Sequence, residues 1–324
     1  MASLRYALVF VAALLTVSMS GSYAEAEDYP ARPVRIIVPF GPGGPADVVA
    51  RQVGGILQES LGQPFVVENR TGAGGVIGTL EVAKAPADGY TLLMMSNTQT
   101  ANESLVPQRN YGLMRDLTPI ASLNTSDLVI VVHPAVQANT LQEFIALAKA
   151  QPGKLNYASS GQGTPYHMAG ELFKAMAGID VVHVPYRNSG EARGGVIGGQ
   201  VQMMIDAVPA MAPNVAENQV RALATTGKIR STVLPNVPTV TEAGVPGYEA
   251  TIWLGLMAPA GTPKPIIDKL NAAVNAAIRR PEVEKLWAAQ GAAAMTMTPE
   301  AFDKFLRADI VKWADVVKRL DKPQ

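Results

Sequence analysis

The feature that most constrains the fold of this chain is a regular alternation between short apolar runs and segments of helical periodicity. In the helical segments, apolar residues recur at helical spacing and a glycine often follows the last of them. Strands that alternate with helices form parallel sheets covered on both faces. The sequence therefore predicts the α/β class, with strands expected at VRIIVPF, PFVVENR, TLLMMS, LVIVVHP, KLNYASS, DVVHVPY, VQMMIDA and VRALATT.

The pattern changes after Pro235, where a loop-rich passage leads to the apolar run WLGLMAPAG. Only helical segments are expected beyond that run, and each begins near a proline, as helix starts prefer. Two arrangements of the strands stay open: a single sheet of about eight or nine strands, or two smaller sheets joined by crossing strands. The difference matters because ligands bind at the carboxyl ends of parallel strands.

Residues 1–26 have the features of a secretory signal peptide. They carry Arg5, then an apolar stretch, and they end in small residues. The stretch is too short to cross a hydrocarbon core of about 30 Å, which disfavours the alternative of a membrane anchor. The chain has no cysteine, so neither a lipid anchor nor a disulfide is expected. We therefore expect a soluble protein outside the cytoplasm.

The charge of the chain argues against a polyanionic partner. Lys and Arg together number 27, as do Asp and Glu, and the basic residues are scattered. Nucleic-acid binding usually needs a basic face that releases counterions from phosphates. No nucleic-acid partner is expected.

The first of four glycine-rich corners, FGPGGPAD, lies between an expected strand and an expected helix. Gly41, Gly43 and Gly44 allow the backbone to approach a guest closely. A helix that starts at Pro45 leaves backbone N–H groups unpaired, and its positive end favours an anion. The corner lacks the lysine of a nucleotide phosphate loop. A plain tight turn is the alternative interpretation.

The second corner, ENRTGAGGVIGTLEVA, does not have the spacing of a dinucleotide-binding loop. Gly72 and Gly74 are followed by Ile77 where that motif needs a third glycine, and Gly78 comes one position late. We therefore interpret the segment as a structural helix start and predict no cofactor.

The third and fourth corners repeat the features of the first. NYASSGQGTPYHM places Thr164 as an N-cap before Pro165, and VPYRNSGEARGG places Ser189 at the start of another helix. If two such corners lie in separate halves of the protein, their helix N-termini can face opposite ends of one small ligand. A dicarboxylate would suit that arrangement.

Five segments together resemble one family: YPARPVRIIVPFGPGGPADVVAR, ENRTGAGGVIGTLEVAKAPADGYTLL, NYASSGQGTPYHMAGELFKAMAGIDVVHVPYRNSG, GGQVQMMID and LPNVPTVTEAGVPGYEATIWLGLMAPAGTP. Through them nearly the whole mature chain resembles the Bug-type substrate-binding proteins of tripartite tricarboxylate transporters. The resemblance implies a monomeric periplasmic protein that delivers a small carboxylate to a membrane permease. It also implies the type II binding-protein fold, in which two α/β domains enclose a cleft and are joined by crossing hinge strands. The expected domains are residues 27–127 with 252–324, and residues 128–251.

The resemblance also implies the residues of the binding site. The first corner would hold one carboxylate, and the third corner would hold the other end of the ligand. Two departures from the family pattern, Gln99 where a histidine is frequent and Asn188 where a glycine is frequent, bear on which ligand is bound. The expected ligand-binding residues are Phe40, Gly43, Gly44, Asp47, Ser96, Asn97, Thr98, Ser159, Ser160, Gly161, Gly163, Thr164, His167, Tyr186, Arg187 and Asp206.

Alternatives remain for Asp206 and for the function. Asp206 ends an expected strand, where it either meets a ligand cation or hydroxyl or accepts backbone N–H groups. A periplasmic sensor that presents its closed form to a signalling receptor would share every sequence feature. A hydrolase using Ser159 or Ser160 with His167 is a remote alternative, because the chain has no GxSxG motif. The three histidines do not have the spacing of a zinc site, so we predict neither an enzyme nor a metal.

Overall fold

The computed structural model describes residues 29–320, so the predicted signal peptide, residues 1–26, lies outside the described residues. Within residues 29–320, every helix is too short or too polar to cross a membrane. The strands are β1 (Val34–Val38), β2 (Phe65–Asn69), β3 (Thr91–Ser96), β4 (Leu117–Val132), β5 (Asn156–Ser159), β6 (Val182–Pro185), β7 (Met203–Ala207), β8 (Arg221–Thr225), β9 (Thr251–Pro259) and β10 (Ala292–Ala294).

The helices follow the strands in the alternating order expected of an α/β protein. They are α2 (Pro45–Leu61), the 3₁₀ helix η1 (Ala73–Gly75), α3 (Val76–Ala83), α4 (Asn97–Leu105), α5 (Leu113–Asp116), α6 (Leu141–Ala150), α7 (Pro165–Ala177), α8 (Ser189–Ile197), α9 (Val208–Ala216), α10 (Lys264–Ile278), α11 (Pro281–Ala289) and α12 (Pro299–Leu320).

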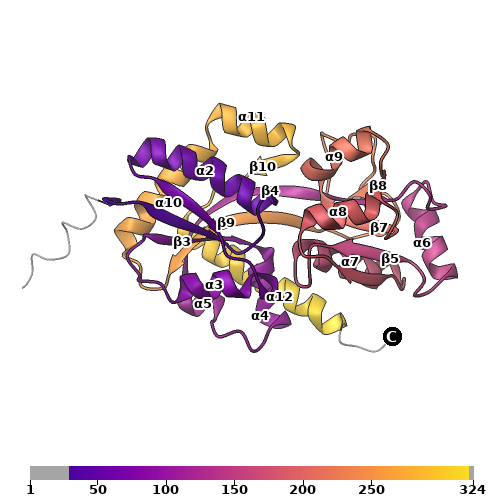
Figure 1. Ribbon diagram of the computed structural model, residues 1–324, viewed down its shortest axis with the longest axis horizontal. Helices are drawn as coiled ribbons and strands as arrows, with labels where there is room; N and C mark the ends of the chain where they lie inside the picture. Colours follow the sequence, from indigo (N-terminus) through magenta and orange to yellow (C-terminus); the bar gives the residue numbers. More distant parts are fainter. Residues whose placement is uncertain (1–28, 321–324) are drawn as a thin grey trace, which may run out of the picture.

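The strands form one connected sheet with two parallel parts. Its order is β2-β1-β3-β9-β4-β7-β5-β6, and β8 and β10 also pair with β4. The β1 pairs and the β5 pairs are parallel, whereas β9 and β4 are antiparallel to their neighbours. Figure 1 shows β4 and β9 running between two lobes. The first lobe contains β1 to β3 with α2 to α5, and the second contains β5 to β8 with α6 to α9. The predicted α/β class with crossing strands is confirmed.

The expected strand LVIVVHP is only the last part of β4, which begins eleven residues earlier at Leu117. The earlier part is rich in polar residues and contains Pro119, so it lacks an apolar strand pattern. It pairs with β9 through irregular register, and β4 changes its main partner from β9 to β7 between Asp127 and Leu128. The short strand β10 was also not expected, because three alanines carry little strand propensity.

Each lobe has its own apolar core. Val34, Ile36 and Leu256 belong to the first core, and Ile130 and Phe144 belong to the second. Helix α12 contacts α4 of the first lobe and α7 of the second, and Trp313 is buried among them. Separate cores with only a few connecting elements are typical of lobes that move relative to one another.

Candidate functional site

The first corner is shaped by a buried carboxylate. Asp47 lies in the first turn of α2 and accepts hydrogen bonds from Gly43 N at 3.0 Å and from the side chains of Arg51 and Asn69. Asn69 Nδ2 also donates to Phe40 O at 3.0 Å, which ties the loop to β2. Although burial opposes the effect, the Arg51 and Gly43 hydrogen bonds lower the pKa of Asp47. Gly43 has φ of 76°, a conformation that favours glycine.

Two histidines, His167 and His183, hold the loop of the third corner in place. Thr164 caps α7 by accepting from His167 N, and its hydroxyl donates to Gly161 O at 2.7 Å. Gly163 N donates to His167 Nδ1 at 3.2 Å. The Oγ of Ser159 lies 2.7 Å from His183 Nε2 and also bonds the backbone of Gly161. The loop therefore presents backbone and hydroxyl groups on a rigid support.

The fourth corner brings a helix start and an ion pair together. Asn188 caps α8 by accepting from Glu191 N at 2.9 Å. One turn into α8, Arg193 Nε lies 3.0 Å from Asp206 Oδ2, at the carboxyl end of β7. Asp206 Oδ1 accepts from Ala207 N at 2.8 Å. Burial raises the pKa of Asp206 to about 6, although the Arg193 charge and the Ala207 amide act in the opposite direction.

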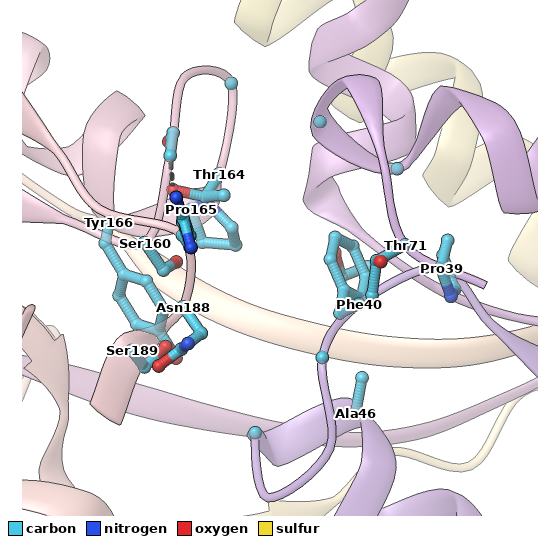
Figure 2. Close-up of a pocket in the computed structure, with 18 of the residues that line it drawn as sticks. Pro39, Phe40, Ala46, Thr71, Ser160, Thr164, Pro165, Tyr166, Asn188 and Ser189 are labelled. Atoms are coloured by element: carbon cyan, nitrogen blue, oxygen red, sulfur yellow. Dashed lines mark hydrogen bonds between the residues drawn. The ribbon is translucent and has the colours of Figure 1, made fainter. Parts of the chain in front are cut away.

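The four corners surround one cavity of about 930 Å³ between the lobes. Figure 2 shows Pro39, Phe40 and Thr71 on one side, facing Ser160 and Thr164 on the other. The larger apolar side chains in its lining include Phe40, Leu105, Val106, Ile252 and Leu254. Backbone N–H groups at helix starts bind anions, and the apolar side chains can cover a hydrocarbon part of the same ligand.

The charged residues that line the cavity are Arg187 and Arg193, both on the second lobe. No aspartate or glutamate of the described residues is in its lining. A wall whose charged side chains are arginines suits an anion.

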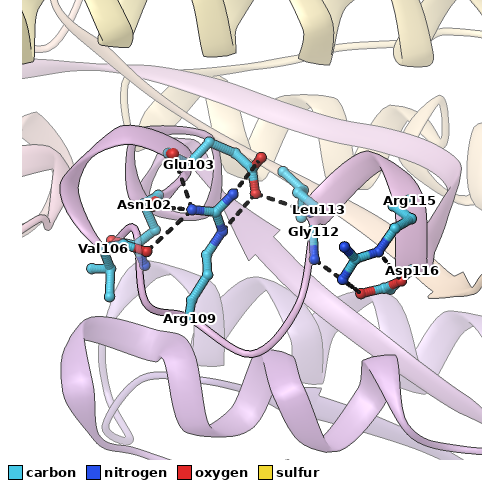
Figure 3. A network of polar contacts seen from close by, with 8 residues as sticks. All are labelled: Asn102, Glu103, Val106, Arg109, Gly112, Leu113, Arg115 and Asp116. Atoms are coloured by element: carbon cyan, nitrogen blue, oxygen red, sulfur yellow. Dashed lines mark hydrogen bonds and ion pairs between the residues drawn. The ribbon is translucent and has the colours of Figure 1, made fainter.

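Helix α4 completes the first wall, and a partly buried arginine holds its end (Figure 3). Arg109 Nη1 donates to the carbonyls of Asn102, Glu103 and Val106, and its Nη2 lies 2.6 Å from Glu103 Oε2. The last carbonyls of a helix have no partner within it, so a cation there satisfies them. Asn102 and Val106 line the cavity, which makes Arg109 a support for the wall.

The sequence profile described as "Tripartite tricarboxylate transporter family receptor" matches residues 49–322. The chain belongs to this family. The resemblance seen in the sequence is thereby confirmed, and the family is one of solute-binding receptors rather than enzymes.

Several relatives of this tripartite tricarboxylate transporter receptor are similar over most of their length. It is 42% identical to protein BugT of Bordetella pertussis over 295 residues, which are 90% of each chain. A solved structure of R. palustris Rpa4515 with adipate has a TM-score of 0.86 and 34% identity, over 90% of this chain and 98% of that one. MatC from Rhodopseudomonas palustris with bound malate has a TM-score of 0.84 and 34% identity, over 89% and 100%.

Most of the residues expected in the receptor's binding site line the cavity. They come from the first, third and fourth corners and from the start of α4, where Ser96 caps the helix together with Gln99. These lining residues are Phe40, Gly43, Gly44, Ser96, Ser160, Gly161, Gly163, Thr164, Tyr186 and Arg187.

Six expected residues lie behind the wall instead: Asp47, Asn97, Thr98, Ser159, His167 and Asp206. Each is buried within its own corner. Asn97 Nδ2 donates to Thr251 O at 3.1 Å and so joins α4 to β9, while Thr98 N donates to Ser96 Oγ. The other four hold the loops described above, so their place in the structure is that of a framework. For Asp206, the structure brings together a backbone amide and the Arg193 cation.

Ser159 pairs with His183 rather than with His167, the partner considered for a hydrolase. The ring of His183 lies 4.2 Å from the ring of His167, and burial followed by the His167 charge lowers the pKa of His183 to about 4. Ser159 is fully buried and outside the cavity lining, so a substrate in the cavity does not reach it. Among residues 29–320, no group of three or more His, Cys, Asp or Glu is arranged to hold a metal ion.

Several contributors to the wall were not expected from the sequence. The second corner, Thr71 to Gly75, lines the cavity although its spacing suggested only a structural helix start. Tyr166 and Arg193 line it too. Arg193 follows Ser189 by four residues, which puts it on the same face of α8 as the helix start, and that spacing is the signal that could have identified it.

Proposed function

We propose that this receptor captures a small carboxylate in the cavity between its lobes and delivers it to a membrane permease of the tripartite type. The observation that carries the proposal is the composition of the cavity wall. Four glycine- and hydroxyl-rich corners and two arginines line it, and among residues 29–320 no acidic side chain does. Further support comes from the relatives whose structures hold adipate and malate.

We infer that ligand binding closes the two lobes about β4 and β9. The proposed domains are residues 27–127 with 252–324, and residues 128–251. The change of β4 partner between Asp127 and Leu128 supports the boundary. A ligand that bridges both walls has more contacts in the closed form, and this differential contact favours closure. A monomer would suffice for this cycle, and the predicted signal peptide would place it in the periplasm.

Calorimetric titration of the mature protein tests the proposal. The panel contains malate, adipate, citrate, terephthalate, benzoate and nicotinate, with glucose as the control that lacks a carboxylate. At least one carboxylate is expected to bind with micromolar or tighter affinity and to raise the melting temperature, since a ligand that binds only the native state stabilises it. The proposal would be contradicted if the control bound and none of the carboxylates did.

A further inference from the structure

The arginine–aspartate pair of the second lobe has a close counterpart in the first lobe. In both, a buried aspartate sits beside the cavity and holds an arginine: Asp47 with Arg51, and Asp206 with Arg193. Arg51 binds its aspartate through both Nε and Nη2, also bonds Asn69, and is absent from the cavity lining. Arg193 reaches Asp206 through Nε and does line the cavity.

Arg193 Nε lies 3.0 Å from Asp206 Oδ2, but the two atoms are not aligned as a hydrogen bond. Neither of its terminal nitrogens makes a hydrogen bond to another of the described residues. Its side chain is 24% exposed, whereas that of Asp206 is fully buried. A guanidinium whose Nε lies against a buried carboxylate can use its terminal nitrogens for a planar anion.

The surroundings of Arg193 also suit an anion. Tyr166 lines the cavity beside it, and its buried hydroxyl makes no aligned hydrogen bond. Burial, followed by the Asp206 charge, raises the pKa of Tyr166, so the hydroxyl stays protonated. The start of α8 adds the positive end of a helix, although that feature alone would not define a site.

We propose that Arg193, oriented by Asp206, receives an anionic group of the ligand and thereby selects dicarboxylates over monocarboxylates. This inference rests on the proposed function and deepens it. Within the described part of the chain, the first wall carries no charged side chain, and it can hold one carboxylate through backbone N–H groups. The second carboxylate then meets the guanidinium of Arg193 on the opposite wall.

The experiment compares matched ligands that differ by one carboxylate. Titrations use adipate against hexanoate, malate against 3-hydroxybutanoate, and terephthalate against 4-methylbenzoate. They are run on the native protein and on Arg193→Met, Arg193→Lys, Arg187→Met and Arg51→Met. Arg51→Met is the matched control, because it too removes a cation from a buried aspartate, but one outside the cavity lining.

The native protein is expected to prefer at least one dicarboxylate. Arg193→Met should lower the affinity for that dicarboxylate by about 100-fold and change the affinity for the matched monocarboxylate only a few-fold, so the preference disappears. Arg193→Lys should keep part of the preference, because lysine keeps the positive charge but not the planar pair of donors of a guanidinium. Arg51→Met should keep it, and if Arg187→Met removes it while Arg193→Met does not, the preference depends on Arg187 and the inference is wrong. A merely structural role would weaken both ligands of a pair alike.

A second variant guards against misfolding, because Arg193→Met leaves Asp206 buried without its cation. Arg193→Met combined with Asp206→Asn removes both charges and should show the same lost preference. If either folded variant retains the preference, or if the native protein binds the paired monocarboxylates as tightly, the inference is wrong while the proposed function stands. If the native protein binds none of these acids and none of the panel that tests the proposed function, the proposed function fails, and the inference fails with it.

Discussion

The two walls of the cavity differ in the groups that they offer to a ligand. As far as the structure describes the chain, the first wall carries no charged side chain and consists largely of glycine, proline and backbone groups, whereas the second carries two arginines and several hydroxyls. Behind each wall lies a buried aspartate paired with an arginine. In the first lobe the Asp47–Arg51 pair stabilises the loop, and in the second lobe Arg193 lines the cavity.

This difference shows that the role of a buried aspartate–arginine pair depends on whether its arginine lines the cavity. Asp47 accepts a backbone amide of its corner, which gives the loop a fixed form without contributing charge to the cavity. Asp206 instead orients a guanidinium at the cavity wall. The first wall should therefore depend on backbone shape, and the second on side-chain charge.

The largest effect is expected from filling the space beside the first wall. Gly44 lines the cavity, has φ of −79°, and would meet only Gly41 O at 3.6 Å if it carried a Cβ. Gly44→Leu should fold, but its side chain would block the approach of a carboxylate to the backbone. Carboxylate affinity measured by calorimetry should fall by at least about 100-fold.

Gly55→Leu is the control for this variant. Gly55 lies on the exposed side of the same helix, with no atom within 4 Å of its Cβ position. It should bind normally and be slightly more stable, because glycine is a poor helix former. Unchanged affinity in Gly44→Leu would remove the first corner from the binding site.

The next effect concerns the support of the first wall. Arg109 is 11% exposed and holds three carbonyls at the end of α4, so Arg109→Met leaves those groups and Glu103 without their cation. The free energy of unfolding in urea should fall by about 3 kcal/mol. Arg115→Met is the control, since Arg115 is 73% exposed and pairs only with its neighbour Asp116. It should change stability by less than about 0.5 kcal/mol, and equal losses in the two variants would refute the distinction.

The smallest effect is expected in how the stability of variants at Asp47 and Asp206 depends on pH. Asp47 has a lowered pKa, so its ionised form stabilises the native protein above the ordinary pKa, and this stability is lost as pH falls through the folded value. Asp47→Asn should cost about 1–3 kcal/mol at pH 7, and less in acid. Burial raises the pKa of Asp206 to about 6, so ionised Asp206 destabilises the native protein, and the penalty grows as pH rises from about 4 to 6.

Asp206→Asn should therefore raise the stability at pH 7 by on the order of 1–3 kcal/mol, with the gain vanishing near pH 4. Urea unfolding of the ligand-free proteins from pH 4 to 7 measures both differences from the native chain. The lowered pKa of His183 acts in the same pH range, but both variants keep His183, so its contribution cancels. Parallel pH curves for the two variants would contradict the contrast between the walls.

The local parts of this protein follow from its sequence. The alternating pattern predicts the α/β class, and Thr164, Pro165 and the glycines of the first corner mark helix starts that the structure contains. These features depend on neighbours within a few residues, such as the N-cap bond from His167 N to Thr164 Oγ1. Periodicity and capping report this kind of interaction directly.

Only the tertiary structure decides which of these residues face the ligand cavity. Asp206 and Arg193 lie on different elements, and Ser159 meets His183 rather than His167 because β5 and β6 pair in parallel. The polar first part of β4 is a strand because β9, more than a hundred residues later, supplies its hydrogen bonds. Which way a side chain points depends on contacts between distant segments, and neither residue type nor spacing along the chain encodes those contacts locally.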